Sequence, residues 1–254
     1  MKKKPAPPVK ELSASYRVLS IYQYLAPALL APMSFMLWMR SSGENIRFSL
    51  IAWGIPVSFA YIVPGVGTNV LKLWEFKTRF RLGRFRPHHG FVFGSATSAL
   101  AWACISGDVI SAAKLPQTFQ AAFVLASVLG FWNMLYDALA IRCGFLIVYN
   151  RPWAEGKSPE AVAADYAPWV FGGFGFAYGL SLGIAAAFAE KTTAPANVWG
   201  LFAALLALCI VLPVGGYMVA SRIKYGDLGL RPASPSADSP EKTTAPDREK
   251  SQLQ

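Results

Sequence analysis

The chain has 254 residues, a formal net charge of +10 and 54% hydrophobic residues. The hydrophobic residues are gathered into long runs, which argues against the one or two soluble domains that the length alone would allow. A helix needs about 20 mostly apolar residues to cross a bilayer core of roughly 30 Å. The sequence therefore predicts an all-α integral membrane protein with six transmembrane helices. The predicted spans are residues 18–39, 48–66, 91–109, 119–140, 169–188 and 199–221.

The N-terminus, residues 1–17, is basic and is predicted to be disordered ahead of the first span. A basic start before an apolar run is also typical of a signal peptide. The first run is longer than a secretory hydrophobic region, however, and no small-residue cleavage pattern follows it. We therefore expect an uncleaved first span.

The basic residues predict the orientation of the chain. Nineteen of the 24 lysines and arginines lie in the N-terminus, in the loops 67–90 and 149–168, and after residue 221. Such residues prefer the cytoplasmic side of a membrane, so both termini are predicted to be cytoplasmic. The tail 222–254 is rich in Pro, Ser and mixed charge and is expected to be disordered. Small size and short loops indicate a bacterial inner membrane.

The loop 67–90 alternates cations with aromatic and aliphatic residues. This pattern can hold anionic lipid headgroups at the membrane surface, or it can hold the anionic group of a substrate, for which Arg84 and Arg86 are the candidate residues. Glu75 can pair with Arg79 if this segment is helical. Both ends of the loop are tethered to spans, so we expect membrane lipids and not nucleic acid as partners.

His88 and His89 are the only histidines of the chain, and they precede the third span. Adjacent residues point apart on a helix, and no third ligand stands at metal spacing, so the sequence predicts neither a metal site nor a cofactor. A histidine beside the arginines can act as a general acid or base on an anionic substrate. His88 and His89 are therefore candidate catalytic residues.

The fourth predicted span carries the polar residues that a bilayer makes most costly. Asn133 and Asp137 are one turn apart, so the amide can hydrogen-bond the carboxylate, and Arg142 is expected near the inner headgroup level. As one helix, residues 119–150 would be about 48 Å long, so a break is expected near Gly144. The small and polar residues of this span share one helical face: Ala126, Gly130, Asn133, Asp137, Ala140 and Gly144.

In the loop 149–168, Ser158 can cap a short helix that Pro168 would end. The fifth span then places Gly175, Gly179 and Gly183 four residues apart, so that one helical face has almost no side chains. Such a face lets another helix approach closely. We expect it to pack on the small residues of the fourth span, and a homo-oligomer or larger membrane complex through it is the alternative.

Two classes of function remain open. In the first, the protein is a transport, binding or membrane-complex subunit, with Asn133, Asp137 and Arg142 at a polar seam between spans four and five. Alternatively, it is a membrane enzyme that modifies a lipidic or isoprenoid anionic substrate at the cytoplasmic leaflet. In that case, Arg84 and Arg86 bind the anionic group, and His88 or His89 and Asp137 transfer protons. The enzyme hypothesis requires Asp137 and the histidine pair to share one cavity. In the structural alternative, Asn133 and Asp137 only bridge neighbouring helices.

Overall fold

The computed structural model describes residues 9–111, 115–189 and 195–234. In this part of the chain, six helical stretches are long and apolar enough to cross a membrane, which confirms the predicted all-α, multi-pass architecture. These stretches are Ala14–Ser41, Ile46–Val70, His89–Gly107, Leu115–Arg142, Pro159–Phe188 and Asn197–Tyr225, and each overlaps one predicted span. The long helices are α1 (Val9–Ser41), α2 (Ile46–Gly65), α3 (His89–Ser111), α4 (Leu115–Arg142), α7 (Gly173–Ala189) and α8 (Pro195–Tyr225).

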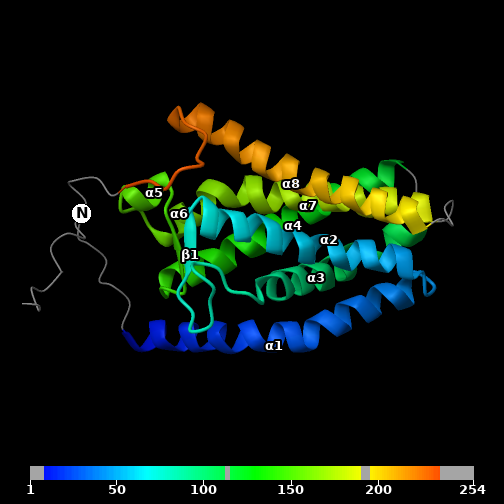
Figure 1. Ribbon diagram of the computed structural model, residues 1–254, viewed down its shortest axis with the longest axis horizontal. Coiled ribbons are helices and arrows are strands. Elements are labelled where there is room, and N and C mark those ends of the chain that lie inside the picture. The colour runs from blue at the N-terminus through cyan, green and yellow to red at the C-terminus, as the bar shows by residue number, and fades with distance from the viewer. Residues whose placement is uncertain (1–8, 112–114, 190–194, 235–254) are drawn as a thin grey trace, which may run out of the picture.

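Shorter elements connect the long helices, and most of them gather at one end of the bundle (Figure 1). We call this end, which carries the two strands, the hairpin end. The connecting elements are a π-helical turn η1 (Val66–Val70), strand β1 (Trp74–Phe76), strand β2 (Leu146–Val148), helices α5 (Arg151–Ala154) and α6 (Pro159–Ala167), and a second π-helical turn η2 (Pro168–Gly172).

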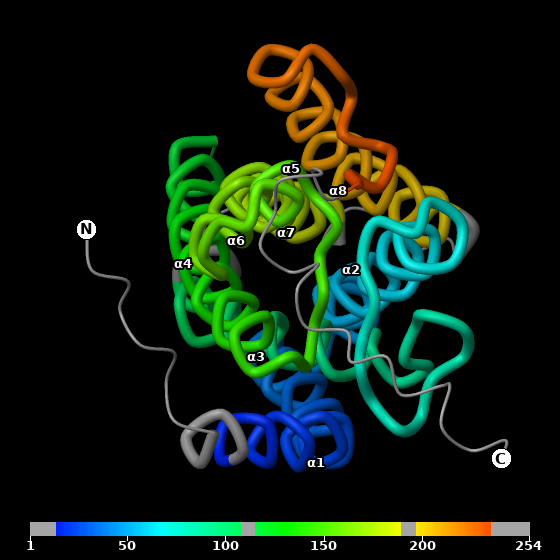
Figure 2. Tube along the Cα trace, turned by 90° about the vertical axis from the view of Figure 1, so that its left-hand side faces the viewer, coloured from blue at the N-terminus to red at the C-terminus, as the bar shows by residue number. Residues whose placement is uncertain are grey.

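The long helices lie alongside one another, and Figure 2 looks at the bundle from the hairpin end. α1 packs mainly on α3, α4 on α7, and α8 on α7 and α2. The core between them is aromatic, with the rings of Phe59 and Phe174 only 4.1 Å apart. Two buried polar side chains find hydrogen-bond partners there: Trp38 Nε1 donates to Ser98 Oγ at 3.0 Å, and the Tyr178 hydroxyl donates to the carbonyl of Ala52.

The glycine face of the fifth span packs on α4 within the same chain. A Cβ atom added at Gly179 would lie 2.5 Å from the Cα of Ala122, and additions at Gly175 and Gly183 would collide with Leu125 and Thr118. The expected contact between spans four and five is therefore confirmed. Oligomerisation through this face stays a prediction, and it would require another chain to replace α4 at these glycines.

The fifth span begins earlier than predicted. The Ser158 side chain accepts a hydrogen bond from the amide of Ala161 and caps α6, as expected. Pro168 does not end this helix, however, because the chain continues through η2 into α7. The π-helical turn starts at the proline, where the missing N–H removes one regular helical hydrogen bond.

The fourth span ends close to the predicted position. α4 stops at Arg142, and Gly144 adopts a φ of +73°, a left-handed conformation that glycine reaches without a steric penalty. This turn sends the chain directly into β2. The long run of residues 119–150 is therefore split into a helix and a strand.

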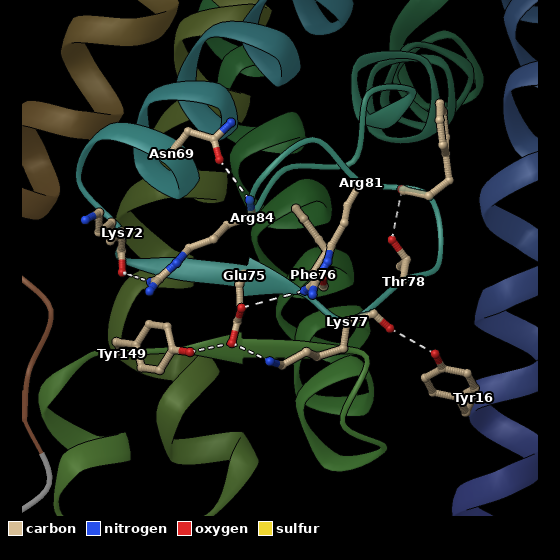
Figure 3. Close-up of polar contacts among 11 residues, drawn as sticks. Tyr16, Asn69, Lys72, Glu75, Phe76, Lys77, Thr78, Arg81, Arg84 and Tyr149 are labelled. Atoms are coloured by element: carbon tan, nitrogen blue, oxygen red, sulfur yellow. Dashed lines mark hydrogen bonds and ion pairs between the residues drawn. The ribbon is translucent and has the colours of Figure 1, made fainter.

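Strands β1 and β2 form a small two-stranded antiparallel sheet, although more than sixty residues separate them in the chain. In it, Phe76 is opposite Leu146, and the amide of Lys77 donates to the carbonyl of Phe145 at 2.9 Å. The predicted helical pairing of Glu75 with Arg79 is wrong, because Glu75 lies in β1. Its carboxylate instead accepts a 2.5 Å hydrogen bond from the Tyr149 hydroxyl and lies 2.7 Å from Lys77 Nζ (Figure 3).

Both predicted terminal boundaries are wrong in part. α1 already begins at Val9, and α8 continues to Tyr225 instead of ending at residue 221. Beyond α8, residues 226–234 turn back along the hairpin end, where the amide of Ala233 donates to the carbonyl of Tyr149 at 2.8 Å. The remaining tail and the first eight residues lie outside the described residues.

Candidate functional site

A cavity of about 950 Å³ opens within the bundle toward the hairpin end, and side chains from all six spans line it. This volume lies in the range of small-molecule sites. Along α3 the lining runs from His89 to Leu100, a depth of about 16 Å at 1.5 Å per residue. Phe59, Leu129 and Ile210 line its wall beside Leu100. The cavity thus combines an apolar wall with polar groups from the hairpin end.

Arg86 is the most unusual of these polar groups. Only 1% of the residue is exposed, and its guanidinium carbon lies 4.7 Å from the ring centre of Phe76 and 5.6 Å from that of Phe145. The β1–β2 pairing brings these two rings together. In the described chain no carboxylate lies within ion-pair distance of Arg86, and its Nη1 atom has no hydrogen-bond partner. A buried cation without a counter-charge is costly, and an unused donor adds to that cost.

His89 fixes the guanidinium in place. Arg86 donates to Nδ1 of His89 from Nε at 3.0 Å and from Nη2 at 2.9 Å. Because a guanidinium has donors only, Nδ1 must be the acceptor, and the ring proton lies on Nε2. The rings of Phe76 and Phe93 flank the imidazole, with ring centres 4.8 and 6.1 Å away. His89 is therefore held as a neutral ring, and its one N–H donor is Nε2.

Asp137 lines the same cavity from α4. Its Oδ2 atom accepts a 2.6 Å hydrogen bond from the Tyr166 hydroxyl of α6. The hydrogen bond expected between Asn133 and Asp137 is not the one that forms, because Asn133 Nδ2 donates to the carbonyl of Leu129 at 2.9 Å. Of the small and polar residues that share one face of α4, Asn133 and Asp137 line the cavity, whereas Gly130 lies against Gly172.

Two tyrosines complete the polar end of the cavity. Tyr22 of α1 and Tyr136 of α4 both line it, and their ring centres are 6.1 Å apart. The buried Tyr136 hydroxyl lies close enough to Arg86 for a weak side-chain hydrogen bond. Among the described residues, however, neither this hydroxyl nor Nη1 of Arg86 has a hydrogen-bond partner of regular geometry.

A second polar cluster lies where α8 ends. The side chain of Asp165 is only 2% exposed and accepts 2.6 Å hydrogen bonds from Lys224 Nζ and the Tyr225 hydroxyl, as well as a 3.2 Å bond from Asn150. All its donors come from α8 and the turn before α5. This carboxylate connects α6 to both elements and stabilises the wall of the cavity.

Three of the predicted site residues lie outside the lining of this cavity. His88 stacks on Phe80, with ring centres 6.0 Å apart, and its Nε2 atom lies 3.3 Å from Gln23 Oε1. Arg84 donates to the carbonyl of Lys72 at 3.2 Å (Figure 3). Arg142 forms an ion pair with Glu160 on a half-exposed surface.

Sequence patterns alone did not indicate Tyr136, Tyr166 or Asp165 as site residues. Tyr136 adjoins Asp137, and a carboxylate inside a span gives reason to search for a donor nearby. Tyr166 and Asp165 lie in the short helix that was expected within the loop 149–168, and no sequence pattern connected this helix with the fourth span. In the part of the chain that the structure describes, no three His, Cys, Asp or Glu side chains are grouped so that they could hold a metal ion.

No protein-family model, curated protein or solved structure matches the chain.

Proposed function

We propose that the protein binds an anionic amphipathic molecule of the membrane in this cavity, as a membrane-embedded binding or transport component. One observation carries the proposal: among the described residues, the buried cation Arg86 has no carboxylate at ion-pair distance and no regular hydrogen-bond partner for its Nη1 atom. Proteins rarely bury such a charge without a partner. Neighbouring side chains cover Nη1, so a small shift of these side chains would let an anionic group of the ligand accept from it. Such a group would supply both the charge and the missing hydrogen bond.

The rest of the cavity suits the apolar part of such a molecule. Phe59, Leu100, Leu129 and Ile210 line a wall that reaches into the spans, where a hydrocarbon chain can be buried. Neither a small inorganic anion nor a sugar needs such a wall. The combination of one buried cation and a deep apolar surface therefore favours a lipid-like ligand.

The orientation that the basic residues predict places the hairpin end on the cytoplasmic side of a bacterial inner membrane. The anionic group of the ligand would then lie near the cytoplasmic leaflet. The exposed loop around Phe80 and Leu82, which also carries Arg79 and Arg81, suits contact with anionic headgroups there.

Native mass spectrometry of the detergent-solubilised protein tests the proposal with two probes that share an oleoyl chain. Lysophosphatidylglycerol carries a phosphate, and monooleoylglycerol does not. We expect at least tenfold more bound lysophosphatidylglycerol, and we expect Arg86→Gln to lose this preference. Arg40→Gln is the matched control, because it removes the same charge from an exposed position in the last turn of α1, outside the lining of the cavity. Equal binding of both probes, or a preference that persists in Arg86→Gln, would overturn the proposal.

A lipid-modifying enzyme is the second candidate, and one observation favours it: His89 and Asp137 line one cavity. Against it, Nδ1 of His89 is already the acceptor of two hydrogen bonds from Arg86. A general base needs a free ring nitrogen, and Nε2 carries the proton. The geometry therefore supports binding better than it supports proton transfer by His89.

A further inference from the structure

We infer that the head group of the ligand carries a hydrogen-bond donor, an ammonium or a hydroxyl group, beyond its anionic group. The inference rests on the proposed function, because it specifies what the same cavity selects. It follows from the acceptors that α4 presents beside the buried cation.

These acceptors are the Oδ1 atoms of Asn133 and Asp137, one helical turn apart. Asn133 uses its amide nitrogen on the carbonyl of Leu129, and Asp137 uses Oδ2 on the Tyr166 hydroxyl. Within the described residues, no group donates a hydrogen bond to Oδ1 of either side chain. Both side chains line the cavity. A ligand that donates hydrogen bonds toward α4 would satisfy both.

The charges of the cavity lead to the same chemistry. Arg86 and Asp137 both line it, but they form no ion pair with each other in the described structure. An anionic group alone would pair with Arg86, but it would present only acceptor oxygens to Oδ1 of Asp137, which is also an acceptor. A head group with an anionic group at Arg86 and a donor at Asp137 interacts favourably with both residues.

Such a head group also matches the polar groups that remain unpaired. The buried Nη1 of Arg86 requires an acceptor, and the phosphate or carboxylate of the ligand provides it. The buried Tyr136 hydroxyl has no regular hydrogen-bond partner among the described residues, and it can donate to the same anionic group. Both ends of a head group with an anion and a donor therefore find complementary atoms from separate elements of the fold.

Competition among four lysophospholipids with the same oleoyl chain tests the inference by native mass spectrometry of the full chain. All four share the free hydroxyl of their acylglycerol, so they differ only in the group attached to the far side of the phosphate. Lysophosphatidic acid has no such group, and that of lysophosphatidylcholine is a cation without N–H donors. Lysophosphatidylethanolamine adds an ammonium, and lysophosphatidylglycerol adds hydroxyls. We expect at least one of the last two to bind tenfold more than both of the first two. The better of these two identifies the donor as ammonium or hydroxyl.

The variant Asp137→Asn makes the test sharper, because two effects of opposite sign are expected. Binding of the preferred donor-bearing lipid should fall at least fivefold, whereas binding of lysophosphatidic acid should rise, because the amide nitrogen of asparagine can donate to a phosphate oxygen. A misfolded variant would lose both. Glu155→Gln, on the exposed turn after α5, should change neither.

Two results would overturn the inference. One is equal binding of all four lipids, and the other is preferential binding of lysophosphatidic acid or lysophosphatidylcholine. If that binding still depended on Arg86, the proposed function would stand and only the donor requirement would fail. If no lysophospholipid bound in an Arg86-dependent way, the proposed function itself would fail.

Discussion

Arg86 donates from Nε and Nη2 to the same nitrogen of His89, Nδ1, at 3.0 and 2.9 Å. The two residues are three positions apart, at the point where the loop enters α3. The imidazole thereby orients the guanidinium while Nη1 remains unused. His89, which the sequence suggested as an acid–base residue, instead orients the side chain of Arg86.

This relationship predicts different effects for two substitutions of His89. In His89→Asn, the amide oxygen can take the place of Nδ1, so binding of lysophosphatidylglycerol should stay within about threefold of the wild type. His89→Leu removes the acceptor. A hydrogen bond to a charged group contributes about 1.5–3 kcal/mol, so we expect roughly a tenfold or greater loss of affinity. Titration by native mass spectrometry measures both. Equal losses would mean that Nε2 contacts the ligand directly and would contradict a purely orienting role.

The hydrogen bonds of Asp165 are expected to hold the end of α8 against α6. Asp165→Asn replaces a carboxylate that accepts from Lys224, Tyr225 and Asn150. The loss should cost about 2 kcal/mol, since breaking a hydrogen-bonded charge pair leaves poorly satisfied donors. We expect faster tryptic cleavage after Lys224. The control is Glu155→Gln, because its ion pairs with Arg151 and Lys157 are exposed and contribute little. A cleavage rate equal to that of the wild type would show that other contacts hold α8.

Glu75 predicts a dependence of stability on pH. Burial alone would raise the pKa of this carboxyl group, but hydrogen bonds from Lys77 and Tyr149 outweigh it and lower the pKa below its usual value. Burial and the bond to Glu75 in turn raise the pKa of Tyr149 to about 12. A lowered carboxyl pKa stabilises the fold above the unfolded-state value, and this stabilisation is lost as pH falls through the folded-state pKa.

We therefore expect Glu75→Gln to lower the melting temperature at pH 7 but to match the wild type at a pH below the lowered pKa. Thermal unfolding in detergent between pH 7 and 3 measures the difference. In the same variant, the phenol of Tyr149 should ionise at a lower pH, which a difference absorbance titration detects. A melting-temperature difference that is independent of pH would contradict this role for the carboxylate.

The sequence predicted the features that depend on local pattern. Long apolar runs identify spans whatever their packing, and Gly144 was the one residue near the end of α4 suited to a left-handed turn. The close packing of α7 on α4 at Gly179 was predicted from the four-residue spacing of the glycines alone. Each of these features is encoded within a few turns of one segment, so no knowledge of distant residues was needed.

The candidate site depended on contacts that sequence spacing does not reveal. Arg84 and Arg86 have almost the same neighbours in the chain, yet one lies at the surface of the hairpin end and the other is buried. Arg86 is buried because β1 pairs with β2 and brings Phe76 and Phe145 together around it. Pairing between strands so far apart in the chain has no short-range signal. The sequence therefore indicated Arg86 as a candidate, but it could not distinguish Arg86 from Arg84.

The packing of α7 on α4 predicts a strict requirement for glycine at position 179. A Cβ atom there would lie 2.5 Å from the Cα of Ala122, which is backbone and cannot move aside as a side chain can. Gly179→Ala should therefore destabilise the protein by about 1–3 kcal/mol, the usual cost of overpacking. Gly215→Ala in α8 is the matched control: a Cβ atom there meets nothing within 4 Å, and alanine favours a helix by roughly 0.5–1 kcal/mol. Thermal unfolding of both variants in the same detergent separates packing from helix propensity. Equal stability of the two would mean that α4 and α7 can move apart without cost, and the α4–α7 contact would then not be a close-packed part of the core.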